Sequence, residues 1–175
     1  MGHRRGEGWL SRLFGCVPAA EREGVELQGP CWELSGPRDA SAFFRALADL
    51  VPPGSILFIE VVYRAADIRA YLSERSAART TRVAMGTIWP RPAVFHMEIT
   101  PENLEGLASL ADQHAEPELA DHLHVYHGDA VVVQWYDAFS APLFVSKDTP
   151  EEKVREFCVR LGISCREREN WRVRT

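Results

Sequence analysis

The sequence has 175 residues, 46% of them hydrophobic and 26% charged, as in a globular domain large enough to bury a sizeable core. No stretch approaches the roughly 18 consecutive apolar residues that a membrane-spanning helix needs. The net charge of −5 argues against a nucleic-acid-binding protein, which usually presents a basic face.

Two features of composition bear on the setting of the protein. The basic residues are nearly all Arg and Ala is abundant, which indicates a GC-rich bacterial coding sequence. The four cysteines show neither zinc-finger nor Cys-x-x-Cys spacing. Because no secretory signal is recognisable, we expect reduced thiols and a cytoplasmic protein.

Residues 1–24 are interpreted as an N-terminal extension of a domain that begins near Val25. Its apolar residues, Trp9, Leu10, Leu13 and Phe14, lie close to three arginines and fit one turn of an amphipathic helix. One hypothesis is weak docking to a membrane surface or a partner. The other is a flap that packs on its own domain or frays.

The first half of the domain alternates short strands with helices. Asp39 is a suitable N-cap for a helix whose apolar stripe includes Phe43 and Leu47. The next strand is apolar except for Glu60, which predicts burial on both of its faces. The expected elements are strands 25–28 and 31–34, a helix from 39 to 51, strand 55–63, helix 65–75, a polar Arg-bearing loop 76–82 and strand 83–89.

The second half shows clearer periodicity. The run Thr100-Pro101-Glu102 predicts a helix start, and Thr149 with Glu152 predicts a capping box before a helix that ends at Gly162. Gly128-Asp129 divides two alternating runs and predicts a β-hairpin. The expected elements are strands 93–99, 122–127, 130–136 and 142–146, helices 101–112 and 149–161, an acidic loop or single helical turn over 113–121, and an Arg-rich edge strand from 163–168 or 171–173.

These elements predict a single α+β domain over residues 25–175. We expect a mixed β-sheet of five to seven strands with helices mainly on one face. Strands 93–99 and 122–127, joined by helix 101–112, are expected to lie side by side and parallel, because successive strands connected by a helix usually do.

Charge is distributed unevenly along the chain. Residues 92–146 contain nine acids and no Lys or Arg, whereas the rest of the chain carries 16 acids and all 20 basic residues. One interpretation is a solvated acidic face; the other is a surface that attracts a cationic partner. The acids of this segment are Glu98, Glu102, Glu105, Asp112, Glu116, Glu118, Asp121, Asp129 and Asp137.

The leading functional hypothesis is a non-enzymatic, immunity- or adaptor-like domain that binds a basic protein through this acidic surface. The residues proposed to contact the partner are Glu116, Glu118, Asp121 and Asp129. No G-x-S-x-G elbow, P-loop or G-x-G-x-x-G run is present, so no catalytic residue is assigned and no cofactor is expected.

The alternative hypothesis is a metal-binding module or metal-dependent hydrolase. The period-two pattern puts His96, Glu98, His122 and His124 on the sheet face opposite helix 101–112. Three or four such ligands are able to hold a divalent ion such as zinc. The competing interpretation is that these imidazoles are half-buried polar spacers, hydrogen-bonded to their neighbours.

Overall fold

The computed structural model describes residues 17–62 and 65–172, and within them seven strands form one open sheet. The strand order is β3-β2-β4-β5-β6-β1-β7, and each pair of neighbours is antiparallel. The strands are β1 (Cys31–Leu34), β2 (Ile56–Val61), β3 (Ala93–Glu98), β4 (His122–His127), β5 (Ala130–Trp135), β6 (Leu143–Ser146) and β7 (Cys165–Arg168).

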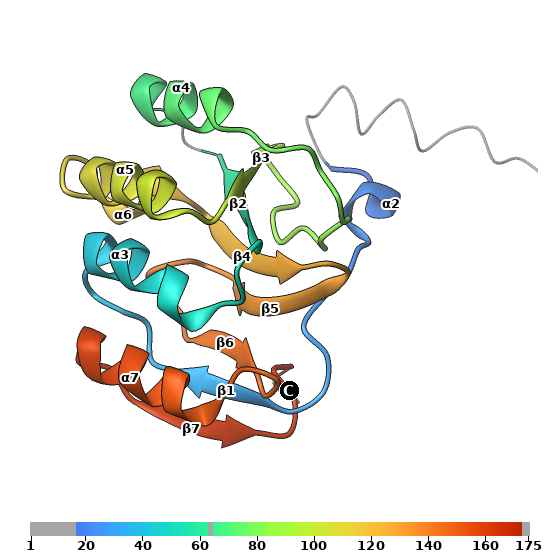
Figure 1. The fold of residues 1–175 in the computed structure, drawn as a ribbon. Helices are drawn as coiled ribbons and strands as arrows, with labels where there is room; N and C mark the ends of the chain where they lie inside the picture. The colour runs from blue at the N-terminus through green and yellow to red at the C-terminus, as the bar shows by residue number, and fades with distance from the viewer. Residues whose placement is uncertain (1–16, 63–64, 173–175) are drawn as a thin grey trace, which may run out of the picture.

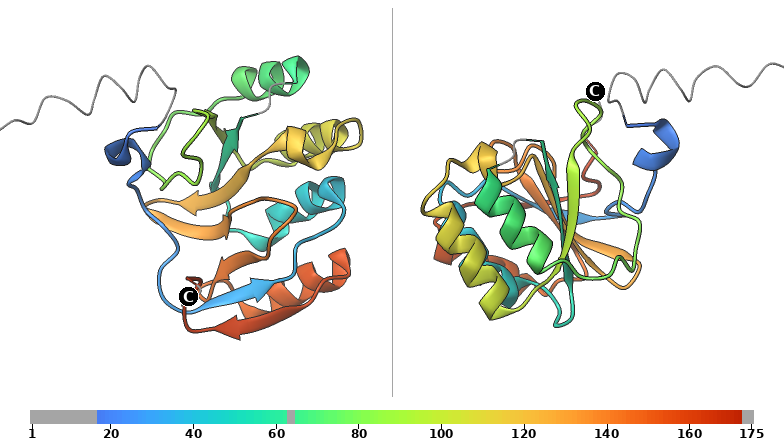
Figure 2. Two further views of the ribbon diagram at one scale, coloured as in Figure 1. Left: turned by 180° about the vertical axis from the view of Figure 1, so that it is seen from behind. Right: turned by 90° about the horizontal axis from the view of Figure 1, so that it is seen from above.

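Helices cover one face of this sheet, as Figure 1 shows. They are α3 (Ala40–Leu50), α4 (Ala66–Glu74), α5 (Pro101–Ala111), the single turn α6 (Glu116–Leu119) and α7 (Glu151–Leu161). The opposite side carries the short α2 (Ala19–Arg22) and the long 75–92 connection between α4 and β3 (Figure 2). The α+β class, the strand number and the placement of helices mainly on one face are therefore confirmed, whereas the sheet is antiparallel throughout and not mixed as expected.

Local chemistry explains where the helices begin and end. Asp39 accepts a hydrogen bond from the backbone N–H of Ala42 at 2.9 Å, and Thr100 caps α5 in the same way through Asn103 at 3.2 Å. Gly162 ends α7 with a φ of 63°, a left-handed conformation that favours glycine. The capping box expected at Thr149 is wrong, because α7 begins at Glu151 and Pro150 occupies the N-cap position.

Two hydrophobic cores lie on the two sides of the sheet. The larger core packs the helices against side chains such as Leu57, Leu123 and Trp135. The smaller core joins Phe58 and Tyr126 of the opposite face to Leu27, Val83 and Trp171. Strand β2 contributes to both cores, which confirms the expected burial of this apolar strand on both faces.

The expected pairing of strands 93–99 and 122–127 is wrong. Strand β2 lies between them, so Phe58 pairs with His96 on one side and with His124 on the other. Strands β3 and β4 run in the same direction but are not hydrogen-bonded to each other. The reason is that β2, the strand with apolar residues on both faces, takes the covered position between them.

Two other expected strands do not form. One isolated β-bridge, between Val25 and Val83, joins residues 25–28 to residues 83–89. Both segments are otherwise irregular. The backbone N–H of Val17 donates to the carbonyl of Ile88 at 3.0 Å, so residues 17–24 of the predicted extension contact the domain. The docking hypothesis rests on Trp9–Phe14, which lie outside the described residues. No helix among the described residues is long and apolar enough to cross a membrane.

Candidate functional site

The four proposed metal ligands share the sheet face opposite the helices, as the alternation predicts. His96 and Glu98 lie on β3, and His122 and His124 lie on β4, with β2 between the two strands. The ring of Phe58 occupies the middle position: its centroid is 5.3 Å from that of His96 and 5.5 Å from that of His124. An aromatic ring therefore separates the two histidines at the point where a shared ion would have to sit.

Each of the three histidines already uses its Nδ1 atom. His124 accepts a hydrogen bond from the backbone N–H of Trp135 at 3.2 Å, and His122 accepts one from that of Asp137 at 2.9 Å. The Nδ1 atom of His96 lies 2.9 Å from the hydroxyl of Tyr126. These contacts match the interpretation of the imidazoles as hydrogen-bonded spacers, although all three rings are buried and not half-buried.

Burial also keeps two of these imidazoles neutral. It lowers the pKa of His124 to about 3, with a smaller contribution from His122. It lowers the pKa of His96 to about 4, with a smaller contribution from the positive charge of Arg79. Glu98 remains exposed at the sheet edge, and among the described residues no three His, Cys, Asp or Glu side chains are placed to hold one metal ion.

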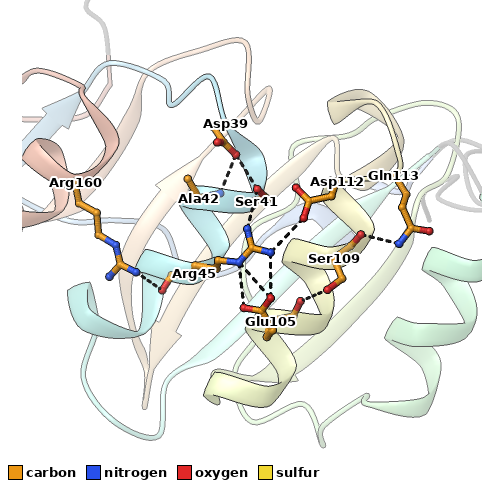
Figure 3. A network of polar contacts seen from close by, with 9 residues as sticks. All are labelled: Asp39, Ser41, Ala42, Arg45, Glu105, Ser109, Asp112, Gln113 and Arg160. Atoms are coloured by element: carbon orange, nitrogen blue, oxygen red, sulfur yellow. Dashed lines mark hydrogen bonds and ion pairs between the residues drawn. The ribbon is translucent and has the colours of Figure 1, made fainter.

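The acidic segment is partly neutralised by a residue from outside it. Arg45 of α3 reaches across to α5, where its Nη2 atom lies 3.0 Å from Oε1 of Glu105 and 3.2 Å from Oδ2 of Asp112 (Figure 3). The same guanidinium donates to the hydroxyl of Ser41 at 3.1 Å. Two of the nine acids are thus paired on the helical face and contribute little free negative charge there.

The four proposed partner-binding acids do not form one patch. Glu116, Glu118 and Asp121 lie at or just before the start of β4, whereas Asp129 lies in the hairpin turn beyond its end. The six residues of β4 lie between the two ends and span about 20 Å at the usual rise of about 3.3 Å per residue. Asp129 also accepts a hydrogen bond from the hydroxyl of Thr81 at 3.1 Å.

Two acids of the first group have local structural roles. Glu118 accepts from the backbone N–H of Ala115 at 3.2 Å and lies 3.3 Å from His114. Asp121 accepts from the backbone N–H of Val62 with its side chain, and its own N–H donates to the carbonyl of Glu60 at 2.8 Å. Glu116 makes no hydrogen bond or ion pair with another described residue, so its carboxylate is the most available of the group.

A pocket of about 630 Å³ lies at this end of β4 and is lined by Glu116, Asp121 and Asp137; we call it the acidic pocket. The described residues that line it include three acids and no Lys or Arg. They are Val62, Thr87, Ile88, Trp89, Pro90, Glu116, Ala120, Asp121, His122, Asp137, Ala138, Phe139 and Ser140. Trp89 is 65% exposed and Ile88 55%, so the rim presents apolar surface beside the carboxylates.

Strained backbone marks one wall of the acidic pocket. Asp137 has a φ of 48° and Phe139 a φ of 68°, and these are the two positive values among non-glycine residues in the described part of the chain. A non-glycine residue in this region costs conformational energy and persists only where its surroundings hold it. Asp137 is one of the nine acids of the segment, but the sequence did not predict that it would line the same pocket as Glu116 and Asp121. Its position depends on the turn after β5.

Glu60, which stands out in the sequence as the one acid in an apolar strand, holds the backbone at Thr87, a residue that lines the pocket. Its side chain is completely buried, and its two carboxylate oxygens accept from the backbone N–H groups of Gly86 at 2.8 Å and Thr87 at 3.0 Å. Backbone amides commonly satisfy buried carboxylates in this way. Glu60 thereby fixes the part of the 75–92 connection that carries Ile88 and Trp89.

A comparison of this chain with protein-family models, with curated proteins and with solved structures finds no match.

Proposed function

We propose that this chain is a non-enzymatic, immunity- or adaptor-like protein-binding domain that recognises a basic partner protein through the acidic pocket. The observation that carries the proposal is the convergence of Glu116, Asp121 and Asp137 on one pocket with an exposed Trp89 at its rim. Elsewhere in the acidic segment, Glu105 and Asp112 are already paired with Arg45.

An inserted Arg or Lys side chain suits this pocket chemically. Its aliphatic stem would contact apolar residues such as Ile88, while its charged end would meet the carboxylates. Among aromatic side chains, the indole of Trp attracts a cation most strongly, and Trp89 places one at the rim of the pocket. The open carboxylates would also steer a basic protein during encounter, so association should weaken as salt is added.

The test uses a fluorescently labelled hexa-arginine peptide as the probe and measures its affinity by anisotropy at low and physiological salt. The pocket variant is Glu116→Gln/Asp137→Asn, which leaves the structural acids Asp121 and Glu118 intact. The matched control is Glu98→Gln/Glu102→Gln, which changes charge by the same amount within the acidic segment but outside the pocket.

We expect the pocket variant to lose about tenfold or more in affinity and the control to lose about twofold or less. Equal losses in the two variants would indicate general charge attraction and would overturn the proposal. Binding that does not change when the salt concentration rises from about 0.02 to 0.15 M would overturn it as well.

A further inference from the structure

A second pocket, with the opposite charge, lies on the sheet face away from the helices. It has a volume of about 480 Å³ and is bounded by α2, the 75–92 connection and strand β3. Among the described residues its charged lining consists of Arg79, Arg82, Arg91 and Glu21, and His96 also lines it. We call it the arginine pocket; three guanidinium groups and one carboxylate give its described lining a net charge of about +2 when His96 is neutral.

The arginines retain donors for a ligand. Arg91 pairs with Glu21 at 2.6 Å, and Arg82 donates to the backbone carbonyl of Ala20. Arg79 makes a long hydrogen bond of 3.4 Å to the carbonyl of Thr81. Each guanidinium carries five N–H groups, so these contacts leave several donors on each side chain. Planar guanidinium groups match the oxygens of phosphates and carboxylates.

His96 lies in this pocket beside Arg79 and has a lowered pKa. Burial is the main cause of its low pKa, and the charge of Arg79 lowers that pKa further. His96 is therefore neutral, and its Nδ1 atom is engaged with the hydroxyl of Tyr126. An anion entering the pocket would bring the negative charge that this group of cations lacks.

Size and lining indicate the class of anion. A phosphate monoester carries a charge between about −1.5 and −2 at neutral pH, close to the net charge of the pocket, whereas a single carboxylate carries only −1. The volume is within the range of sites for small organic ligands. Phe58, Met85 and Val94 supply apolar wall that a bare inorganic ion would not use. We propose that the arginine pocket binds a small organic phosphate, with the phosphate on Arg79 and Arg91 and the organic part against these apolar side chains.

Calorimetric titration with phenyl phosphate tests the proposal, with inorganic phosphate and benzyl alcohol as comparison probes. The test variant is Arg79→Gln/Arg91→Gln, which keeps the hydrogen bond from Arg82 to the backbone carbonyl of Ala20 and removes the ion pair of Arg91 with Glu21. The control is Arg38→Gln/Arg69→Gln, which removes the same charge from two exposed arginines outside the pocket. Thermal unfolding of both variants verifies that they fold.

We expect phenyl phosphate to bind at least tenfold more tightly than inorganic phosphate, and benzyl alcohol not to bind. The test variant should lose at least tenfold in affinity for phenyl phosphate, while the control should change by less than twofold. Equal affinity for phenyl and inorganic phosphate would overturn the organic-phosphate assignment. Binding that is unaffected in the test variant, or that is seen only with a long polyanion such as heparin, would overturn the site.

The imidazole of His96 gives a second readout that a purely structural role of the arginines would not move. Saturation with phenyl phosphate should raise the pKa of His96, measured by NMR titration, because a nearby negative charge favours the imidazolium form. The shift should be absent in Arg79→Gln/Arg91→Gln and retained in Glu116→Gln/Asp137→Asn. The latter variant separates this site from the acidic pocket, so the two proposals fail or succeed independently.

Discussion

The buried carboxylate of Glu60 and the backbone amide of Thr87 are 27 residues apart in the chain and are joined by a hydrogen bond of 3.0 Å. A second bond, to Gly86, uses the other carboxylate oxygen. Together they attach the middle of the 75–92 connection to the interior strand β2. This connection borders both pockets, since Thr87–Pro90 line the acidic pocket and Arg79, Arg82 and Arg91 line the arginine pocket.

Replacing Glu60 should therefore affect both stability and binding. In Glu60→Gln one of the two backbone N–H groups faces an amide NH2 instead of an oxygen, so we expect a loss of about 2 kcal/mol in the free energy of unfolding. Urea unfolding measures it, and affinity for the hexa-arginine peptide should fall as the rim of the acidic pocket loosens. Glu98→Gln, at an exposed position on neighbouring β3, should change stability by no more than about 0.5 kcal/mol. Similar losses in the two variants would contradict the role given to Glu60.

Gly86 allows the 75–92 connection to approach β4 closely. A Cβ atom at this position would lie 2.5 Å from two atoms of the His122 ring and 2.7 Å from the ring of Tyr136. We expect Gly86→Ala to destabilise the protein by about 2 kcal/mol through overpacking. In a His122→Ala background the cost should fall markedly, which a double-mutant cycle measures as coupling. A cost that is independent of residue 122 would refute this packing argument.

Most of the fold follows from signals that are local in the sequence. Alternation, the capping residues Asp39 and Thr100, and Gly162 located the seven strands and the longer helices within a few residues, although strands were also expected over 25–28 and 83–89, where none forms. The pairing of β3 and β4 could not be derived in the same way. It depends on which strand best tolerates burial on both faces, and β2 precedes both of them in the chain.

The candidate sites depend on contacts between distant segments, and this limits what the sequence reveals. Arg45 pairs with Glu105, 60 residues later in the chain. The count of acids in residues 92–146 therefore overestimates the unpaired negative charge on the helical face. The face shared by His96 and His124 was predicted correctly, but the intervening Phe58 was not. Glu60 was visible as a lone acid in an apolar strand, a signal that predicts a buried, satisfied carboxylate without naming its partners.

Acid should destabilise the protein through His96 and His124. Both have folded-state pKa values far below the ordinary 6.5, so the unfolded chain takes up protons that the folded protein does not. Stability is therefore full above about pH 6.5 and falls as the pH drops below it, by up to about 1.4 kcal/mol per pH unit for each histidine. Urea unfolding between about pH 6.5 and 4.5 measures the slope. In His96→Gln the chain should take up about one proton fewer on unfolding, so the slope should fall by up to about 1.4 kcal/mol per pH unit. An unchanged slope would contradict the assignment.

His114 should act in the opposite direction. Its Nε2 atom lies 2.7 Å from Asp67 of α4 and its Nδ1 atom 3.3 Å from Glu118 of α6, and the hydrogen bond to Asp67 is the main cause of its raised pKa. Because the folded state holds the proton more tightly, the stabilising effect is complete below the ordinary pKa near 6.5 and disappears as the pH rises through the folded-state value. We expect His114→Gln to lose stability relative to the natural sequence at about pH 6, with a smaller difference at about pH 8.5, measured as urea midpoints. Asp67→Asn should reproduce much of this change, since it removes the principal partner and leaves the imidazole in place. A deficit in His114→Gln that is the same at both pH values would show that the imidazole contributes by packing and not by its charge.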